Sequence, residues 1–210
     1  MIVSKNDSIS AQNSKRSDVL NDVLYNMVKK YPDHKSAESV YAKVQIIGRT
    51  YSAALERGAN HDKETEGDIY WEKIIPALLE SGLDELLEIN KKVKKITKYN
   101  LESILKTHKK LVDILQAVTG KENRSFASKY LHFHCKNAFY IFDSRAKERI
   151  NQINIMYDYL LDESSIEPDK EYANFCLKCM ALQDQIFEEY DVFLTPRQID
   201  NLLLQKKSLQ

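Results

Sequence analysis

The sequence predicts an all-α fold, a multi-helix globular protein of about nine helices. Apolar residues recur at three- and four-residue steps along most of the chain, which is the spacing of one helix face. Only five glycines and four prolines occur in 210 residues, few for a β-rich chain full of tight turns. No convincing strand and no fixed-period repeat is found. We expect residues 17–210 to form a single α-helical domain, or two helical lobes with a cleft near residues 120–145.

Residues 1–16 are polar and rich in Ser, Asn and Lys, so we expect a disordered or frayed N-terminus. The helices expected in the first half of the chain cover residues 17–32, 36–58, 62–79 and 83–96, and Pro76 kinks or breaks the third.

In the second half, Asn100 is expected to cap a long helix that ends at Gly120. A shorter helix follows over residues 124–135, and an apolar connection leads to Asp143, a good cap for a helix that reaches residue 161. The last expected helices begin at Pro168, ending near residue 190, and at Thr195-Pro196-Arg197-Gln198, a capping box with proline at the first helical position.

Composition indicates a soluble protein, because apolar residues make up 43% and charged residues 30% of the chain, and 31 basic residues balance 31 acidic ones. The first fifteen residues lack the apolar run of a secretion signal, and no stretch is long and apolar enough for a membrane span. We therefore expect a cytoplasmic protein that does not bind membranes and whose three cysteines are reduced.

Local charge is less even than the total. Residues 89–136 hold twelve Lys or Arg residues and three acidic ones, and residues 137–191 are acidic in excess. A basic surface of this kind is typical of nucleic-acid binding or of a solvated helix face, and both readings stay open.

The turn after Gly120 joins two expected helices into a helix-hairpin-helix. Free backbone N–H groups at the start of the second helix can bind a phosphate. The residues that we expect to contact nucleic acid are Gly120, Lys121, Arg124, Ser125 and Arg145.

Two short stretches in and after this second helix, ASKYL at residues 127–131 and IFDSR at residues 141–145, carry a resemblance. They resemble the helix-hairpin-helix DNA glycosylases, particularly the 8-oxoguanine glycosylases, over residues 100–160. The resemblance implies a DNA-repair hydrolase that binds duplex DNA. In that family a lysine amine attacks the sugar carbon bearing a damaged base, and an aspartate stabilises the charge that develops. The matching residues here are Lys129 and Asp143.

One position departs from the family pattern. Aligning Ala127-Ser128 with the similar pair in the family places the family's lysine at Ser125, one helical turn before Lys129. Either Lys129 has taken over as nucleophile, or the chain keeps the scaffold without the lyase chemistry.

Aromatic and basic residues near Lys129 are candidates for a pocket that stacks an extruded base. They are Arg49, Phe126, Tyr130, His132, Phe133 and Tyr140. The alternative is that the aromatic residues fill the core, Lys129 and Asp143 form a structural ion pair, and Arg49 pairs with Glu56. The protein would then be a non-catalytic helical interaction or accessory module with a protein partner.

Candidate zinc ligands are His132, His134, Cys135, Cys176 and Cys179, since imidazole and thiolate suit that metal. The C-x2-C pair, however, falls in the middle of an expected helix rather than on a turn. We expect no metal and no cofactor.

Overall fold

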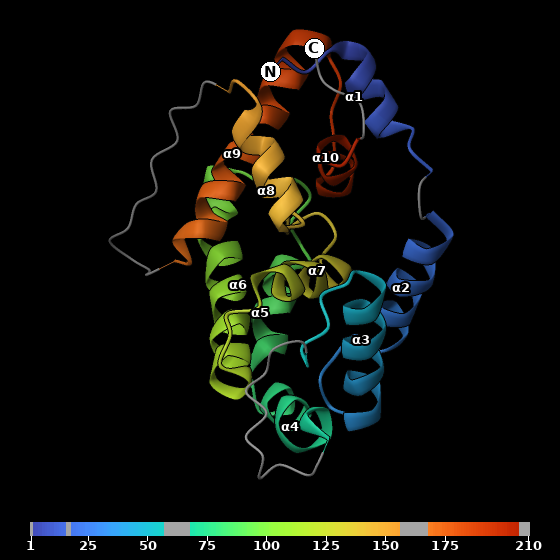
Figure 1. Cartoon of the computed structure of the whole chain (residues 1–210), viewed down its shortest axis with the longest axis vertical. Coiled ribbons are helices and arrows are strands. Elements are labelled where there is room, and N and C mark those ends of the chain that lie inside the picture. Colours follow the sequence, from blue (N-terminus) through green and yellow to red (C-terminus); the bar gives the residue numbers. More distant parts are fainter. Residues whose placement is uncertain (1, 16–17, 57–67, 156–167, 206–210) are drawn as a thin grey trace.

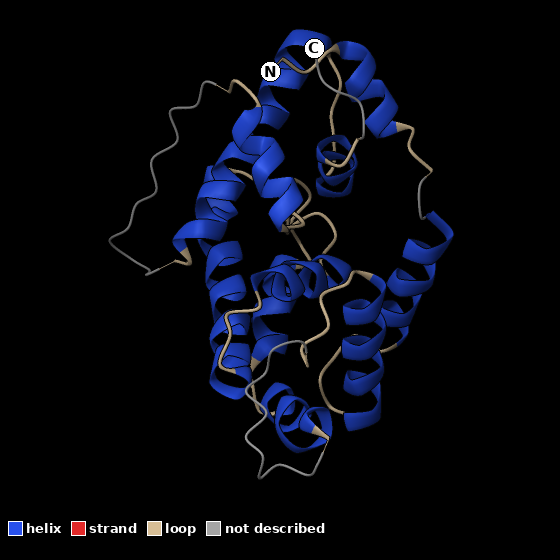
Figure 2. Cartoon of the chain, viewed as in Figure 1, coloured by secondary structure: helices blue, strands red, loops and turns tan. Residues whose placement is uncertain are grey.

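A computed structural model describes residues 2–15, 18–56, 68–155 and 168–205 of the chain (Figure 1). Over these residues every regular element is helical, with ten α-helices and one π-helical turn, so the all-α prediction is confirmed (Figure 2). The elements are α1 (Lys5–Gln12), α2 (Asp18–Lys30), α3 (Ala37–Thr50), η1 (Tyr70–Ile74), α4 (Ile75–Leu79), α5 (Leu83–Asn90), α6 (Lys98–Thr119), α7 (Arg124–His134), α8 (Ser144–Gln152), α9 (Lys170–Tyr190) and α10 (Pro196–Leu203).

Helix α7 lies at the centre of the molecule. In Figure 1 it separates α1, α9 and α10 at the top from α3, α4 and most of α6 below. Helices α2, α3 and α6 pack directly against it. All nine residues from Phe126 to His134 are buried, so this helix presents no wholly solvated face after its first two residues. The stretch that carries the family resemblance is therefore the core helix of the fold.

The N-terminal segment differs from the expectation of a frayed end, because residues 5–12 form helix α1. Ser4 caps it in a capping box with Asp7, and Ala11 is completely buried. The helix packs against α10 and α9. A polar helix of this length is marginal alone in water, so these tertiary contacts stabilise it.

Three predicted helix ends are confirmed. The Asp143 side chain accepts a hydrogen bond from the Ala146 N–H at 2.9 Å, and Thr195 forms its capping box at α10. Gly120 ends α6 with a φ of 73°, a left-handed conformation that costs glycine little.

Other ends differ by a few residues. Thr97 rather than Asn100 caps α6, and Asn100 is the third helical residue, the partner of Thr97 in the capping box. Helix α9 begins at Lys170, with Asp169 as its cap, rather than at Pro168. Pro76 lies in the first turn of α4, directly after η1, where its missing N–H is harmless. The expected start at residue 62 and the expected ends at residues 58 and 161 lie outside the described residues.

Within the described residues, none of the helices combines the length and the apolar character needed to cross a bilayer.

Candidate functional site

A polar cavity of about 260 Å³ opens between the start of α2, the end of α3, the middle of α7 and helix α10. Seven of its lining residues concern the argument below: Asn21, Tyr51, Lys129, Asp143, Arg145, Arg197 and Asp200. The helices that line it can be followed in Figure 1, with α7 at the centre, α10 above it and α2 and α3 at the right.

Lys129 lies on the wall of this cavity, although the residue is only 3% exposed. Its Nζ donates a hydrogen bond to the Ser125 hydroxyl at 2.7 Å and lies 3.6 Å from Oδ2 of Asp143. Burial lowers the pKa of the Lys129 amine, and the charges of Asp143 and Asp200 oppose that change. A lysine in this setting becomes neutral at a lower pH than an exposed lysine.

Asp143 reaches the cavity because it caps α8. One carboxylate oxygen, Oδ1, accepts the backbone N–H of Ala146, and the other faces Lys129. The extended connection before it is held to α7 by Ser128, whose hydroxyl accepts the Phe142 N–H at 3.0 Å. The cap and this connection together fix the carboxylate beside the amine.

Arg197 and Asp200 complete the cavity from α10, and neither was among the predicted site residues. The guanidinium lies 5.5 Å from the ring centres of both Tyr51 and Phe133, and its Nη1 contacts Oδ2 of Asp200 at 3.2 Å. Their spacing, three residues apart on a helix, is the sequence signal that could have found the pair.

Several polar atoms of this pair have no hydrogen-bond partner. Oδ1 of Asp200 and the Nε and Nη2 atoms of Arg197 are buried without one, although Tyr25 lies near enough to influence the guanidinium. Burial raises the pKa of Asp200 to about 6. Buried polar atoms without partners are uncommon in folded proteins and point to water or a ligand in the adjacent space.

The predicted base-pocket residues on α7 lie in the core rather than on the cavity wall. Phe126 packs beside Gly48, and His132 donates from Nδ1 to the Phe139 carbonyl and accepts the Tyr25 hydroxyl at Nε2. Burial lowers the pKa of His132, so this imidazole is neutral. The chemical type of Phe126 and His132 favours a base pocket, but neither side chain lines the cavity.

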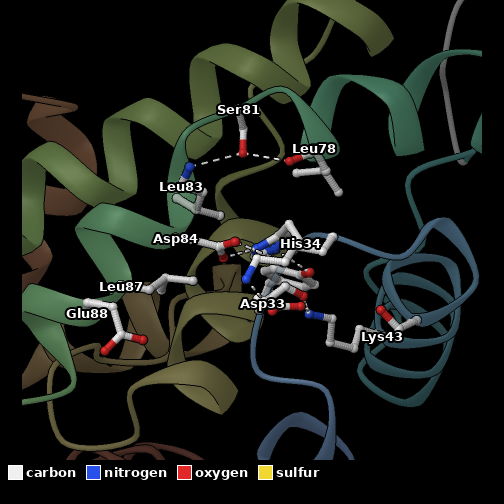
Figure 3. A network of polar contacts seen from close by, with 12 residues as sticks. Asp33, His34, Lys43, Leu78, Ser81, Leu83, Asp84, Leu87 and Glu88 are labelled. Atoms are coloured by element: carbon white, nitrogen blue, oxygen red, sulfur yellow. Dashed lines mark hydrogen bonds and ion pairs between the residues drawn. The ribbon is translucent and has the colours of Figure 1, made fainter.

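Tyr130 is bound in a buried polar network on the opposite side of α7. Its hydroxyl donates to Nε2 of His34 at 2.8 Å, and Nδ1 of His34 donates to Asp84 at 2.6 Å. Figure 3 shows the His34 ring meeting the Asp84 carboxylate, with Lys43 nearby donating to the Asp33 carbonyl at 2.7 Å. The network joins α7 to α5 and has a structural role.

The remaining pocket candidates also lie apart from the cavity. Tyr140 is buried and donates its hydroxyl to Gln183, and Arg49 is largely exposed and pairs with Glu56 at 3.1 Å. Phe133 touches the site by supporting Arg197 and by packing against Tyr51, with the two ring centres 5.5 Å apart. Tyr51, at the end of α3, does line the cavity and donates its hydroxyl to Asn21.

The turn between α6 and α7 offers less to a phosphate than the sequence suggested. The Arg124 guanidinium binds Asp169 at 2.5 Å and also contacts Glu122 and Glu171. These carboxylates link the start of α7 to the start of α9, which leaves exposed Lys121 as the cation that the turn presents to solvent. Arg145, by contrast, lies on the exposed rim of the cavity.

No group of His, Cys, Asp and Glu side chains among the described residues is arranged to hold a metal. All three cysteines are buried free thiols, and burial raises the pKa of Cys135 to about 12.

Comparisons of the chain with protein-family models, with curated protein sequences and with solved structures found no match in any of the three.

Proposed function

We propose that this protein is a DNA-glycosylase-like enzyme that binds duplex DNA, takes a damaged base into the cavity and attacks its sugar with Lys129. The observation that carries the proposal is the pairing of a buried amine with a carboxylate 3.6 Å away on the wall of a polar cavity. Perturbed lysines in cavities are candidates for nucleophiles, because only the neutral amine attacks.

The chemistry assigns a role to each group. The Nζ lone pair of Lys129 attacks the sugar carbon C1′ as the bond from C1′ to the base breaks, and the base leaves with that electron pair and takes up a proton. Positive charge that develops on the sugar is stabilised by the Asp143 carboxylate. The nitrogen gives one of its protons to the leaving base. The bond from C1′ to the ring oxygen then breaks, the ring oxygen takes the second proton of the nitrogen, and Lys129 stays joined to the opened sugar as an imine.

The floor of the cavity suits a nucleobase. Arg197 and Asp200 line the cavity with a guanidinium donor and a carboxylate acceptor. The edge of a base carries a matching row of donors and acceptors, and reading that edge by hydrogen bonds is how enzymes select an extruded base. Arg145 on the exposed rim is the residue that we propose contacts a backbone phosphate.

A second function is favoured by two observations. Lys129 is 3% exposed, as expected for a structural ion pair in a non-catalytic module that binds a protein partner. Arg124 supports the same reading, since its charge is already neutralised by carboxylates.

An assay of base release separates the two functions. Duplexes carrying 8-oxoguanine or another damaged base are incubated with the wild type, Lys129→Ala and Asp143→Asn, and the released base is measured. Both variants should lose at least about 100-fold in rate. Asparagine is a good helix cap, so Asp143→Asn removes the charge while keeping α8 capped.

Lys106→Ala is the matched control, because Lys106 is exposed on α6 and does not line the cavity. It should release base at the wild-type rate. Absence of release from every substrate by the wild type, with no salt-sensitive binding to DNA, would favour the non-catalytic module.

A further inference from the structure

The closest partner of the Lys129 amine is a hydroxyl rather than a carboxylate. Nζ lies 2.7 Å from Oγ of Ser125 and 3.6 Å from Oδ2 of Asp143. Among the described residues, the Ser125 hydroxyl has no other hydrogen-bond partner. The contact therefore restrains the lysine side chain, and the Ser125 hydroxyl makes no other side-chain hydrogen bond within the described part of the chain that would explain it.

We propose that Ser125 is the positioning residue of the site: its hydroxyl holds the Lys129 amine against the cavity, in reach of both Asp143 and the substrate. This inference rests on the proposed function. Ser125 lies at the position where the family that the chain resembles has its lysine. In this chain its hydroxyl accepts a hydrogen bond from Lys129, one helical turn later.

The helix geometry supports this role. Residues four apart on a helix lie on one face, and helical side chains lean toward the N-terminus of the helix. The Lys129 stem therefore extends toward the Ser125 side chain in the first turn of α7. A lysine has four rotatable side-chain bonds, and without a fixed contact its amine would sample several positions. Holding a nucleophile in one of them lowers the barrier to attack.

The two neighbouring serines, Ser128 and Ser144, do not contact the Lys129 amine. The Ser128 hydroxyl bonds both the N–H and the carbonyl of Phe142, which fixes the connection before α8. Ser144 is exposed at the start of α8 and does not line the cavity. Ser125 alone of the three contacts the amine.

Charged groups and the Ser125 hydroxyl both affect the pKa of the Lys129 amine. Burial lowers the pKa of Lys129, Asp143 and Asp200 oppose that change, and Arg145 adds a smaller lowering. Tyr51 lines the same cavity. The Ser125 hydroxyl accepts a hydrogen bond from the ammonium form and so stabilises the charged state. Its removal should shift the titration of the amine to lower pH.

The test uses two measurements on the full chain. In the first, trace acetic anhydride labels the free protein across a pH series, and mass spectrometry of the peptide containing Lys129 gives the midpoint of its titration. In the second, cyanoborohydride traps the protein on a duplex carrying an abasic site, and the trapping rate is followed over the same pH series. The variants are Ser125→Ala, Ser125→Thr and, as control, Ser144→Ala.

Ser125→Ala should lower the labelling midpoint by about one pH unit and reduce the plateau trapping rate at least about tenfold. Ser125→Thr, which keeps a hydroxyl, should restore both, and Ser144→Ala should change neither. A labelling midpoint or a trapping rate that is unchanged in Ser125→Ala would overturn the positioning role. Trapping by the wild type would in that case still support the proposed function.

Failure of the proposed function has a different signature. If Ser125→Ala shifts the labelling midpoint but the wild type forms no trapped product, the hydrogen bond is a structural contact. The enzyme and the positioning role are then both refuted.

Discussion

Replacement of Asp200 by asparagine should stabilise the protein, and the gain should depend on pH. Asp200 is 4% exposed, and burial raises its pKa from 3.8 to about 6. Between these values the unfolded chain releases the proton and the folded chain keeps it. The free energy of unfolding of the wild type therefore falls as the pH rises through this range, and above pH 6 the loss is complete.

The size of the effect follows from the two pKa values. Each pH unit of difference corresponds to about 1.4 kcal/mol, so ionisation of Asp200 in the folded protein costs about 3 kcal/mol at pH 8. Asparagine has the same shape and does not ionise. Asp200→Asn should therefore exceed the wild type in free energy of unfolding by about 3 kcal/mol at pH 8 and by only a few tenths at pH 4.

Urea denaturation of both proteins at pH 4 and pH 8 measures this difference, and the titrating groups that do not interact with Asp200 cancel because both proteins share them. Asp22→Asn, at an exposed position on α2, is the control and should differ from the wild type by the same amount at both pH values. An Asp200→Asn difference that is equal at both pH values, or negative at pH 8, would refute the reasoning.

Three further predictions concern the fold around the site. Tyr130→Phe should lower the free energy of unfolding by about 1–3 kcal/mol in urea, because it leaves Nε2 of buried His34 without a partner; an unchanged midpoint would mean that the network is not stabilising. Gly120→Ala should cost about 1 kcal/mol by thermal unfolding, since alanine is strained at a φ of 73°, and a neutral effect would argue against this turn. Burial lowers the pKa of four histidines below 6.5, so as the pH drops from 7 to 5 the unfolded chain takes up protons that the folded chain does not. The melting temperature should therefore fall over this range, and a melting temperature that does not change with pH would contradict the prediction. The four are His34, His108, His132 and His134.

Much of the fold could be predicted because it depends on local patterns. The apolar spacing along α6 and α7 and the caps at Asp143 and Thr195 each describe a few neighbouring residues, and the structure has them at those places. Helix α1 was missed because its stability comes from α10, at the other end of the chain. No local pattern carries that information.

The candidate site was predicted in part for the same reason. Lys129 and Asp143 are linked by one short connection, and they do meet. Arg197 and Asp200 reach the cavity from a helix far along the chain, so their role depends on tertiary packing. The aromatic residues of α7 were assigned to a pocket by type, whereas the packing of α2, α3 and α6 around that helix buries them.

The most direct test of the proposed chemistry is borohydride trapping on duplexes carrying an abasic site or 8-oxoguanine, followed by mass spectrometry of the linked peptide. We predict a covalent adduct on Lys129 that is lost in Lys129→Ala and kept in Lys106→Ala. No adduct at protein concentrations that bind the duplex, or an adduct that persists in Lys129→Ala, would contradict the assignment of Lys129 as the nucleophile.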